Sequence, residues 1–140
     1  DEIYDDVSIL LVDDDDIDAM AIERCVSRLK LSITIYRARN GLQALDMLRD
    51  GHTIKHPYII LLDLNMPVMG GVPFLHKLRG DDALKRSIVF VLTTSSADED
   101  RVAAYNENIA GYIVKTDAKE GMNNIIKMLD SYSDIVLLPK

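Results

Sequence analysis

Residues 58–71 read YIILLDLNMPVMGG, and the fold class can be inferred from the pattern of these residues. Residues 58–62 form a continuous apolar run, which is typical of a strand buried on both faces of a parallel sheet. Pro67 and the glycines at 70–71 predict a loop after it. Asp63 follows the strand directly. Because ligands of doubly wound sheets bind beyond the carboxyl ends of the strands, Asp63 is the first candidate for a functional residue.

Strands and helices alternate along the rest of the chain. Four further apolar runs predict strands at residues 7–12, 33–38, 88–92 and 111–114. Each strand is followed by a segment with helical signals, so that five helices are expected. Short connections between alternating elements predict the α/β class, with a doubly wound parallel sheet covered by helices on both faces.

Local signals mark several of the expected helices. The first is predicted over residues 17–29, where apolar residues recur at a four-residue step: Ile17, Ala21, Cys25 and Leu29. Three pairs have the spacing of a capping box and predict the starts of later helices: Asn40 with Gln43, Ser96 with Glu99, and Asp117 with Glu120.

The composition limits the classes of function. The chain has 140 residues, 48% of them hydrophobic, which is enough for one domain with a core but too few for two. A balance of 16 basic against 23 acidic residues argues against nucleic acid or an anionic membrane as a direct partner. The single cysteine, Cys25, excludes an internal disulfide and suits a reducing compartment. With no apolar stretch of membrane-spanning length and no signal peptide, we expect a cytoplasmic globular protein.

Polar residues follow the predicted strands at the positions where the strands end. Residues 13–16 are four aspartates after the first strand, Asp63 follows the third, residues 93–96 (TTSS) follow the fourth, and Lys115 follows the fifth. If the strands are ordered 2-1-3-4-5, the first and third are neighbours and the fourth and fifth flank them. One site would then contain two or three carboxylates, a hydroxyl and an ammonium.

This set of groups suits phosphoryl transfer. Clustered carboxylates repel one another unless a hard cation joins them, and Mg²⁺ prefers oxygen ligands. A carboxylate can also act as a nucleophile and form an aspartyl phosphate, with no base required because it is already ionised at neutral pH. The metal, the Lys115 ammonium and the Thr93 hydroxyl would each neutralise the equatorial oxygens of the phosphoryl group.

The residues around these strand ends resemble a known family. The motifs that carry the resemblance are Leu11-Val12-Asp13-Asp14, Leu61-Leu62-Asp63-Leu64-Asn65-Met66-Pro67 with Gly71, Leu92-Thr93-Thr94, and Gly111-Tyr112-Ile113-Val114-Lys115. Over essentially its whole length the chain resembles the receiver domains of two-component response regulators, the CheY-like family. The resemblance implies a flavodoxin-like fold with five strands in the order 2-1-3-4-5 and five helices.

The resemblance also implies a role for each residue of the site. Asp63 would be the phosphoacceptor, assisted in catalysis by Thr93 and Lys115. Thr93 would also be the switch hydroxyl, with Tyr112 as the switch aromatic residue. The implied ligands of Mg²⁺ are Asp13, Asp14, Asp63 and the backbone carbonyl of Asn65.

The chain departs from the family pattern in two places. Thr116 follows Lys115 where the family usually has a proline in a cis peptide, so the cis bond is not expected, because it costs about 3 kcal/mol without proline. The acidic run after the first strand is also longer than usual. We assign the first two acids to the metal and expect Asp15 or Asp16 to cap the helix that follows.

Three other classes of protein were weighed against the receiver. A haloacid-dehalogenase-type phosphatase places a second aspartate two residues after its nucleophile, where this chain has Asn65. A flavodoxin-like flavin binder needs a hydroxyl- and glycine-rich loop for the phosphate, and four aspartates in that place would repel it. A receiver that only docks, without accepting phosphate, remains an alternative that a phosphorylation assay would separate, although the whole acceptor set is present.

The prediction from sequence is a stand-alone receiver domain over residues 1–140, with its core at about 7–132, and not an enzyme acting on other substrates. By resemblance, the donor is a sensor histidine kinase or a histidine phosphotransfer protein, and the output is contact with a downstream protein. Thr93-Thr94-Ser95, the missing proline and the apolar tail resemble single-domain receivers that partner bacterial phytochrome kinases. The tail at 133–140 either folds back on its own domain or packs on a second copy as a homodimer.

Overall fold

The structure is a computed structural model of the chain, and it describes residues 6–115 and 119–139. Five parallel strands form one sheet in the order β2-β1-β3-β4-β5, which confirms the predicted topology. The strands are β1 (Ser8–Val12), β2 (Thr34–Ala38), β3 (Tyr58–Leu62), β4 (Ile88–Thr93) and β5 (Gly111–Val114). The helices are α1 (Asp16–Arg28), α2 (Gly41–Asp50), α3 (Gly71–Arg79), α4 (Asp98–Asn106) and α5 (Lys119–Ile135).

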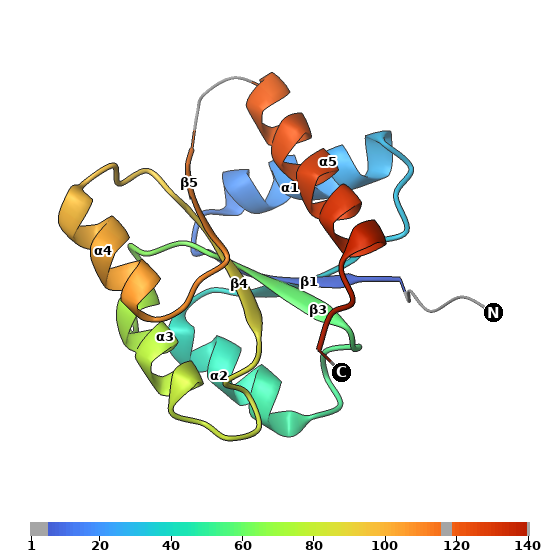
Figure 1. Cartoon of the computed structure of the whole chain (residues 1–140). Helices are drawn as coiled ribbons and strands as arrows, with labels where there is room; N and C mark the ends of the chain where they lie inside the picture. The colour runs from blue at the N-terminus through green and yellow to red at the C-terminus, as the bar shows by residue number, and fades with distance from the viewer. Residues whose placement is uncertain (1–5, 116–118, 140) are drawn as a thin grey trace.

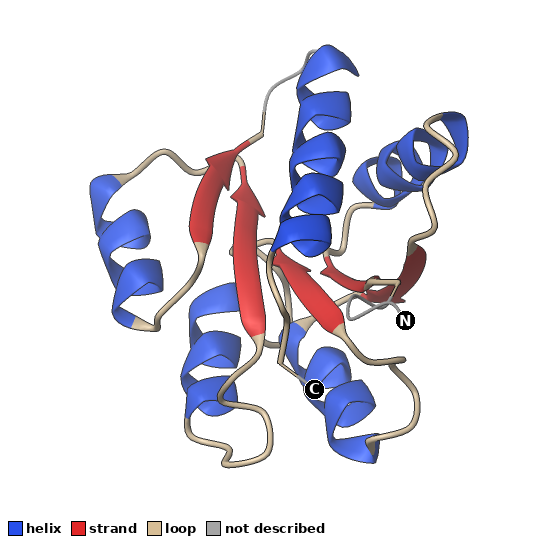
Figure 2. Ribbon diagram, turned by 45° about the vertical axis from the view of Figure 1, so that its right-hand side comes forward, coloured by secondary structure: helices blue, strands red, loops and turns tan. Residues whose placement is uncertain are grey.

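The helices cover both faces of the sheet. Helices α1 and α5 lie side by side on one face, and α2, α3 and α4 lie on the other (Figures 1 and 2). Among the described residues, no helix combines the length and the apolar character needed to cross a membrane.

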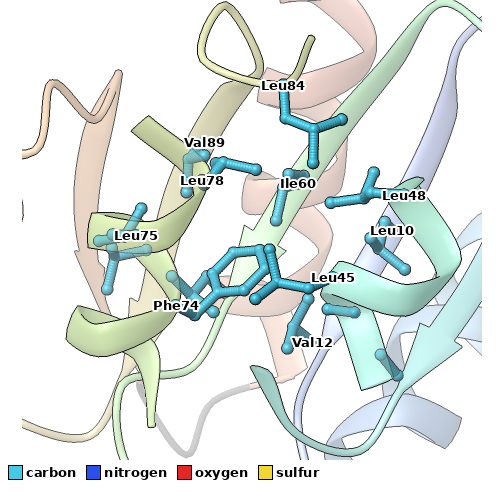
Figure 3. Packing of buried hydrophobic residues seen from close by; sticks show 14 of the residues in the cluster. Leu10, Val12, Leu45, Leu48, Ile60, Phe74, Leu75, Leu78, Leu84 and Val89 are labelled. Carbon is cyan, nitrogen blue, oxygen red and sulfur yellow. The ribbon is translucent and has the colours of Figure 1, made fainter. Parts of the chain in front are cut away.

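Successive side chains of the buried strands point to opposite faces of the sheet, so the core consists of two clusters. In β1, Ile9 and Leu11 face α1 and α5, whereas Leu10 and Val12 face α2 and α3. Figure 3 shows the cluster under α2 and α3, where Phe74 of α3 packs among leucines and valines from the sheet and from α2. Both faces of the central strands are thus apolar, which explains the continuous apolar runs in the sequence.

Helix α1 begins with the cap that the sequence predicts but buries a different stripe. The Asp15 carboxylate accepts hydrogen bonds from the backbone N–H groups of Ile17 and Asp18. The buried residues are Ala19, Ile22, Cys25 and Val26. Ile17 is 77% exposed, so the predicted stripe that began there is wrong. A strict four-residue step advances about 40° too far at each repeat of a 3.6-residue helix, so it cannot stay on one face.

The later helix starts match the sequence prediction unevenly. Asn40 caps α2 by accepting from the Gln43 N–H at 2.8 Å, and the Gln43 side chain accepts from the backbone of Arg39. Helix α4 is different: it begins after Ala97 and has no side-chain cap, so the predicted box of Ser96 with Glu99 is wrong. The predicted box at Asp117 lies outside the described residues.

The predicted tail is partly helical. Helix α5 continues to Ile135, and the backbone N–H of Val136 still donates to the Tyr132 carbonyl at 2.9 Å. Leu138 packs against the core cluster under α1 and α5, whereas Leu137 is 64% exposed. The tail therefore folds back on its own domain at Leu138 while leaving an apolar side chain in solvent.

One arginine ties together the loops at the amino-terminal end of the sheet. The Arg79 guanidinium donates to four backbone carbonyls: Glu107 at 2.7 Å, Lys85 at 2.7 Å, Ser87 at 2.8 Å and Asn108 at 3.0 Å. These carbonyls belong to the segments that lead into β4 and β5. The planar fork of arginine suits several acceptors at fixed positions, which a single ammonium cannot reach together.

We expect Arg79→Ala to lower the free energy of unfolding by about 2–4 kcal/mol, because four carbonyls lose a charged donor. Arg79→Lys keeps the charge and should recover only part of this loss. Urea unfolding followed by circular dichroism measures both variants. An alanine variant as stable as the wild type would show that water replaces the guanidinium without cost.

Candidate functional site

The sequence-predicted residues converge at the carboxyl end of the sheet. The ladder of backbone hydrogen bonds continues past three strand ends: Asp13 N–H donates to Ala38 at 3.0 Å, and Asp63 N–H donates to Val12 at 2.9 Å. Lys115 N–H likewise donates to the carbonyl of Thr93 at 2.8 Å. Each functional side chain is therefore carried by backbone that the sheet itself fixes.

Three carboxylates form the centre of the site. Asp13, Asp14 and Asp63 each offer an oxygen atom, and these atoms all lie within 4.8 Å of one another. Asp13 is 1% exposed and Asp63 is 7% exposed, whereas Asp14 faces solvent. The cluster is thus open on the side of Asp14 and closed beneath Asp13.

Hydrogen bonds from the backbone orient the two buried carboxylates. Oδ1 of Asp13 accepts from the N–H of Asp15 at 2.9 Å, and Oδ1 of Asp63 accepts from the N–H of Asn65 at 3.4 Å. In each case the other oxygen faces the Lys115 ammonium, at 3.2 Å from Asp13 and 3.8 Å from Asp63. Lys115 therefore neutralises the part of the cluster that water does not reach.

Two residues that sequence reasoning missed support this arrangement. Arg37 of β2 donates from Nε and Nη2 to the carbonyl oxygen of Asp13, at 3.2 and 3.1 Å, and pairs with Asp16. Asp18 of α1 approaches the Lys115 ammonium to 2.5 Å. An arginine inside an otherwise apolar strand is a sequence signal for Arg37. Asp18 has no such signal, because acids are common in the first turn of a helix.

Burial and mutual repulsion disturb the titration of the site. Burial raises the pKa of Asp13 to about 6, although the Asp15 N–H and the Lys115 charge act against it. The pKa of Asp63 is raised for the same reason, with Lys115 again opposing. Burial acts to lower the pKa of Lys115, but the Asp18 hydrogen bond and the neighbouring carboxylates hold it above the ordinary value. The site thus gathers four carboxylates, those of Asp13, Asp14, Asp18 and Asp63, around one ammonium.

The predicted switch residues, Thr93 and Tyr112, both contact Ser95 in the loop that follows β4. Thr93 is fully buried at the end of β4, and its Oγ1 accepts from the Ser95 N–H at 3.4 Å. The Tyr112 hydroxyl donates to the Ser95 carbonyl at 2.9 Å. The Ser95 hydroxyl in turn donates to Asp100 of α4 at 2.5 Å. The loop between β4 and α4 is therefore linked both to the site and to α4.

An open cavity of about 540 Å³ gives access to the cluster. Its lining includes Asp14, Asp63, Asn65, Thr94 and Lys115. The donor set fits Mg²⁺, since the ligand atoms are carboxylate oxygens and a divalent cation would stabilise the buried charge of Asp13, whose pKa is raised by burial and also by the Asp63 carboxylate. A cation bound by Asp13, Asp14 and Asp63 would still be open to a phosphate oxygen from the cavity.

Comparison with known proteins agrees with this geometry. The sequence profile of the response regulator receiver domain matches residues 9–127. The "Probable methanogenesis regulatory protein FilR2" of Methanothrix harundinacea is 34% identical, over 94% of this chain and 86% of that protein. Response regulator Rcp1 of Synechocystis sp. is 29% identical, over 94% of this chain and 92% of that protein.

Solved structures of receiver proteins have the same fold as this chain. The phosphorylated cyanobacterial phytochrome response regulator RcpA superposes with a TM-score of 0.85 at 28% identity, covering 97% of this chain and all of that one. The Mn²⁺-bound form of Rcp1 superposes with a TM-score of 0.83 at 28% identity, covering 95% of this chain and 99% of that one. Receiver domains bind Mg²⁺ or Mn²⁺ at an acidic cluster and partner with histidine kinases. The chain belongs to the response regulator receiver domain family, whose function is to accept a phosphoryl group.

Proposed function

We propose that the protein is a response regulator that accepts its phosphoryl group on Asp63. The observation that supports this assignment is the position of Asp63, at the end of the central strand β3, nearly buried and within 4.8 Å of two other carboxylates. Its Oδ2 lies 3.8 Å from the Lys115 ammonium. Asp13 at the end of β1 has the same neighbours, but Asp63 also lines the open cavity from which a phosphoryl donor can approach.

The reaction needs positioning more than covalent help from the protein. An Asp63 carboxylate oxygen forms a bond to phosphorus while the bond from phosphorus to the imidazole nitrogen of phosphohistidine breaks, and the bonding electron pair stays on that nitrogen. Lys115 and the Thr93 hydroxyl stabilise the charge on the equatorial oxygens. The chain thus promotes its own phosphorylation and does not act on other substrates.

Asp13, Asp14 and Asp63 are the proposed carboxylate ligands of Mg²⁺, with the backbone carbonyl of Asn65 as the fourth. When bound, the ion neutralises charge on the phosphoryl oxygens. The burial of Asp13 and the orienting hydrogen bond from Asp15 leave its carboxylate with few alternative positions.

The proposed donor is a sensor histidine kinase, or a histidine phosphotransfer protein, in the cytoplasm. The similarity to RcpA and Rcp1 favours a phytochrome-type kinase. The proposed receiver unit is the whole described fold, with its core at about residues 7–132, and its output is contact with a downstream protein through α4, β5 and α5. Exposed apolar residues on this face, Val102, Tyr105 and Val114, support that assignment.

Incubation with acetyl phosphate and Mg²⁺ should add one phosphoryl group to the wild type, because the acceptor carboxylate is ionised and faces the open cavity. Asp63→Asn should remain unmodified, and a chelator should abolish labelling of the wild type. Asp82→Asn, which removes a fully exposed acid, is the matched control and should label normally. Intact mass spectrometry measures the added phosphoryl group in all four samples: the wild type with and without chelator, and the two variants. Full labelling of Asp63→Asn would show that another residue is the acceptor.

Phosphorylation should alter the surface built by α4 and β5, because new charge beside Thr93 draws its hydroxyl toward the phosphoryl oxygens. Tyr112 should then change its packing, since Ser95 links it to the moving loop. Amide hydrogen exchange with and without phosphorylation measures the response. Lys115→Ala should keep part of the acceptance and lose the response. Unchanged exchange over α4 and β5 would place the output surface elsewhere.

We also propose that the tail contributes to a homodimer. Leu138 packs on its own domain, but Leu137 stays 64% exposed next to the end of α5. A symmetric contact of this residue with the apolar face of α4 and β5 in a second copy would cover both surfaces.

Light scattering of the full chain should therefore give a dimer, and Leu137→Asp should shift it to a monomer, because a charge replaces an apolar contact. The matched control is Leu42→Asp, which changes an exposed leucine on α2, outside the proposed contact. A wild type that is monomeric at high concentration would end the dimer proposal. A Leu137→Asp variant that stays dimeric would move the contact away from the tail.

A further inference from the structure

The Lys115 ammonium lies closer to α1 than to the proposed phosphoacceptor. Its Nζ is 2.5 Å from Oδ2 of Asp18, 3.2 Å from Oδ2 of Asp13 and 3.8 Å from Oδ2 of Asp63. Only the contact with Asp63 is too long for a hydrogen bond. In the unphosphorylated protein, Lys115 is therefore held mainly by Asp18 and Asp13.

Asp18 is well placed to hold a cation at this point. It is the third residue of α1, and its backbone N–H donates to the capping carboxylate of Asp15 at 3.4 Å. Its own carboxylate lines the cavity that also contains Asp63 and Lys115. The two paired side chains are only 23% and 12% exposed, for Asp18 and Lys115, so water screens their attraction less than that of a surface ion pair.

A general helix-terminus role does not account for this contact. Acids in the first turn of a helix interact favourably with its dipole, and both Asp16 and Asp18 occupy that turn. Asp16, however, pairs with Arg37 and Arg39 on the β2 side and does not contact Lys115. The two acids share a helix terminus and differ in their cation, which makes Asp16 a matched control for Asp18.

A phosphoryl group on Asp63 would draw Lys115 away from Asp18. Charge develops on the phosphoryl oxygens during transfer, and Lys115 must approach them to stabilise it. Its bond with Asp18 is fully formed before the reaction and weakens as it moves toward Asp63. A contact that is stronger in the ground state than in the transition state slows a reaction.

We propose that Asp18 is a positioning residue that restrains phosphoryl acceptance by holding Lys115 away from Asp63. Each phosphorylation then exchanges the Asp18 carboxylate for phosphoryl oxygens around the same ammonium, which also couples the first turn of α1 to the state of the site. This inference rests on the proposed function of Asp63.

The first test compares phosphorylation rates with acetyl phosphate at saturating Mg²⁺, so that a change in metal affinity does not enter the result. Asp18→Asn should react about three- to tenfold faster than the wild type, as expected when a partly buried ion pair no longer has to be exchanged. Asp16→Asn should stay within about twofold of the wild type, because it leaves Lys115 alone. Equal rates for wild type and Asp18→Asn, or equal acceleration by Asp16→Asn, would overturn the inference.

A double-mutant cycle tests whether Asp18 acts through the ammonium. In a Lys115→Ala background, Asp18→Asn should give no acceleration, because no cation remains to be released. Acceleration of the same size in that background would overturn the inference. If neither the wild type nor Asp18→Asn accepts a phosphoryl group, the inference fails together with the proposed function. A wild type that labels normally beside an Asp18→Asn variant without acceleration defeats the inference alone.

Nuclear magnetic resonance of the unphosphorylated proteins gives a readout that does not depend on reactivity. The ¹³Cε and ¹⁵Nζ signals of Lys115 should shift in Asp18→Asn and stay in place in Asp16→Asn. In the phosphorylated wild type, the Lys115 signals should also move, because the ammonium leaves Asp18. Lys115 signals that are the same in Asp18→Asn and in the wild type would overturn the inference whatever the rates.

Discussion

Burial of neighbouring carboxylates at the ends of β1 and β3 is the constraint on which the site depends. Asp13 and Asp63 are buried at the place where two parallel strands end side by side, and the sheet prevents them from moving apart. Their raised pKa values reflect the free-energy cost of keeping charge in that position. A divalent cation and an ammonium become favourable neighbours because of this arrangement, and these positive charges can in turn compensate the charge of an incoming phosphoryl group.

The surrounding residues are organised by the same constraint. Arg37 binds the Asp13 carbonyl from β2, and the Asp15 N–H orients its carboxylate, so the first acid of the run has a fixed place. Lys115 compensates the buried charge from β5. Because the compensating groups come from different elements, any change of charge at Asp63 acts on several of them at once. This is the physical basis for a conformational response to phosphorylation.

Much of this could be predicted from sequence, for identifiable reasons. Continuous apolar runs predict the strands. Polar residues that directly follow parallel strands must lie at the same end of the sheet, so the proximity of Asp13, Asp63 and Lys115 could be predicted. The predicted buried stripe that began at Ile17 was wrong, because residues spaced by a constant four positions do not stay on one face of a helix with 3.6 residues per turn. The capping box predicted at Ser96 was wrong because α4 begins one residue later than it requires, with Ala97 at the N-cap position. Asp18 could not be found, since its role depends on a contact 97 residues away along the chain.

Arg79 has a mechanical consequence for the molecule. It fastens the entries of β4 and β5 to the end of α3, at the edge of the sheet opposite the cluster. The two strands are thus clamped where they begin and carry their reactive residues, Thr93 and Lys115, where they end. Backbone pairing with the neighbouring strands holds the rest of both strands, as far as Thr93 and Val114. The loop between β4 and α4 lies beyond both restraints and can therefore move without loosening the core beneath it.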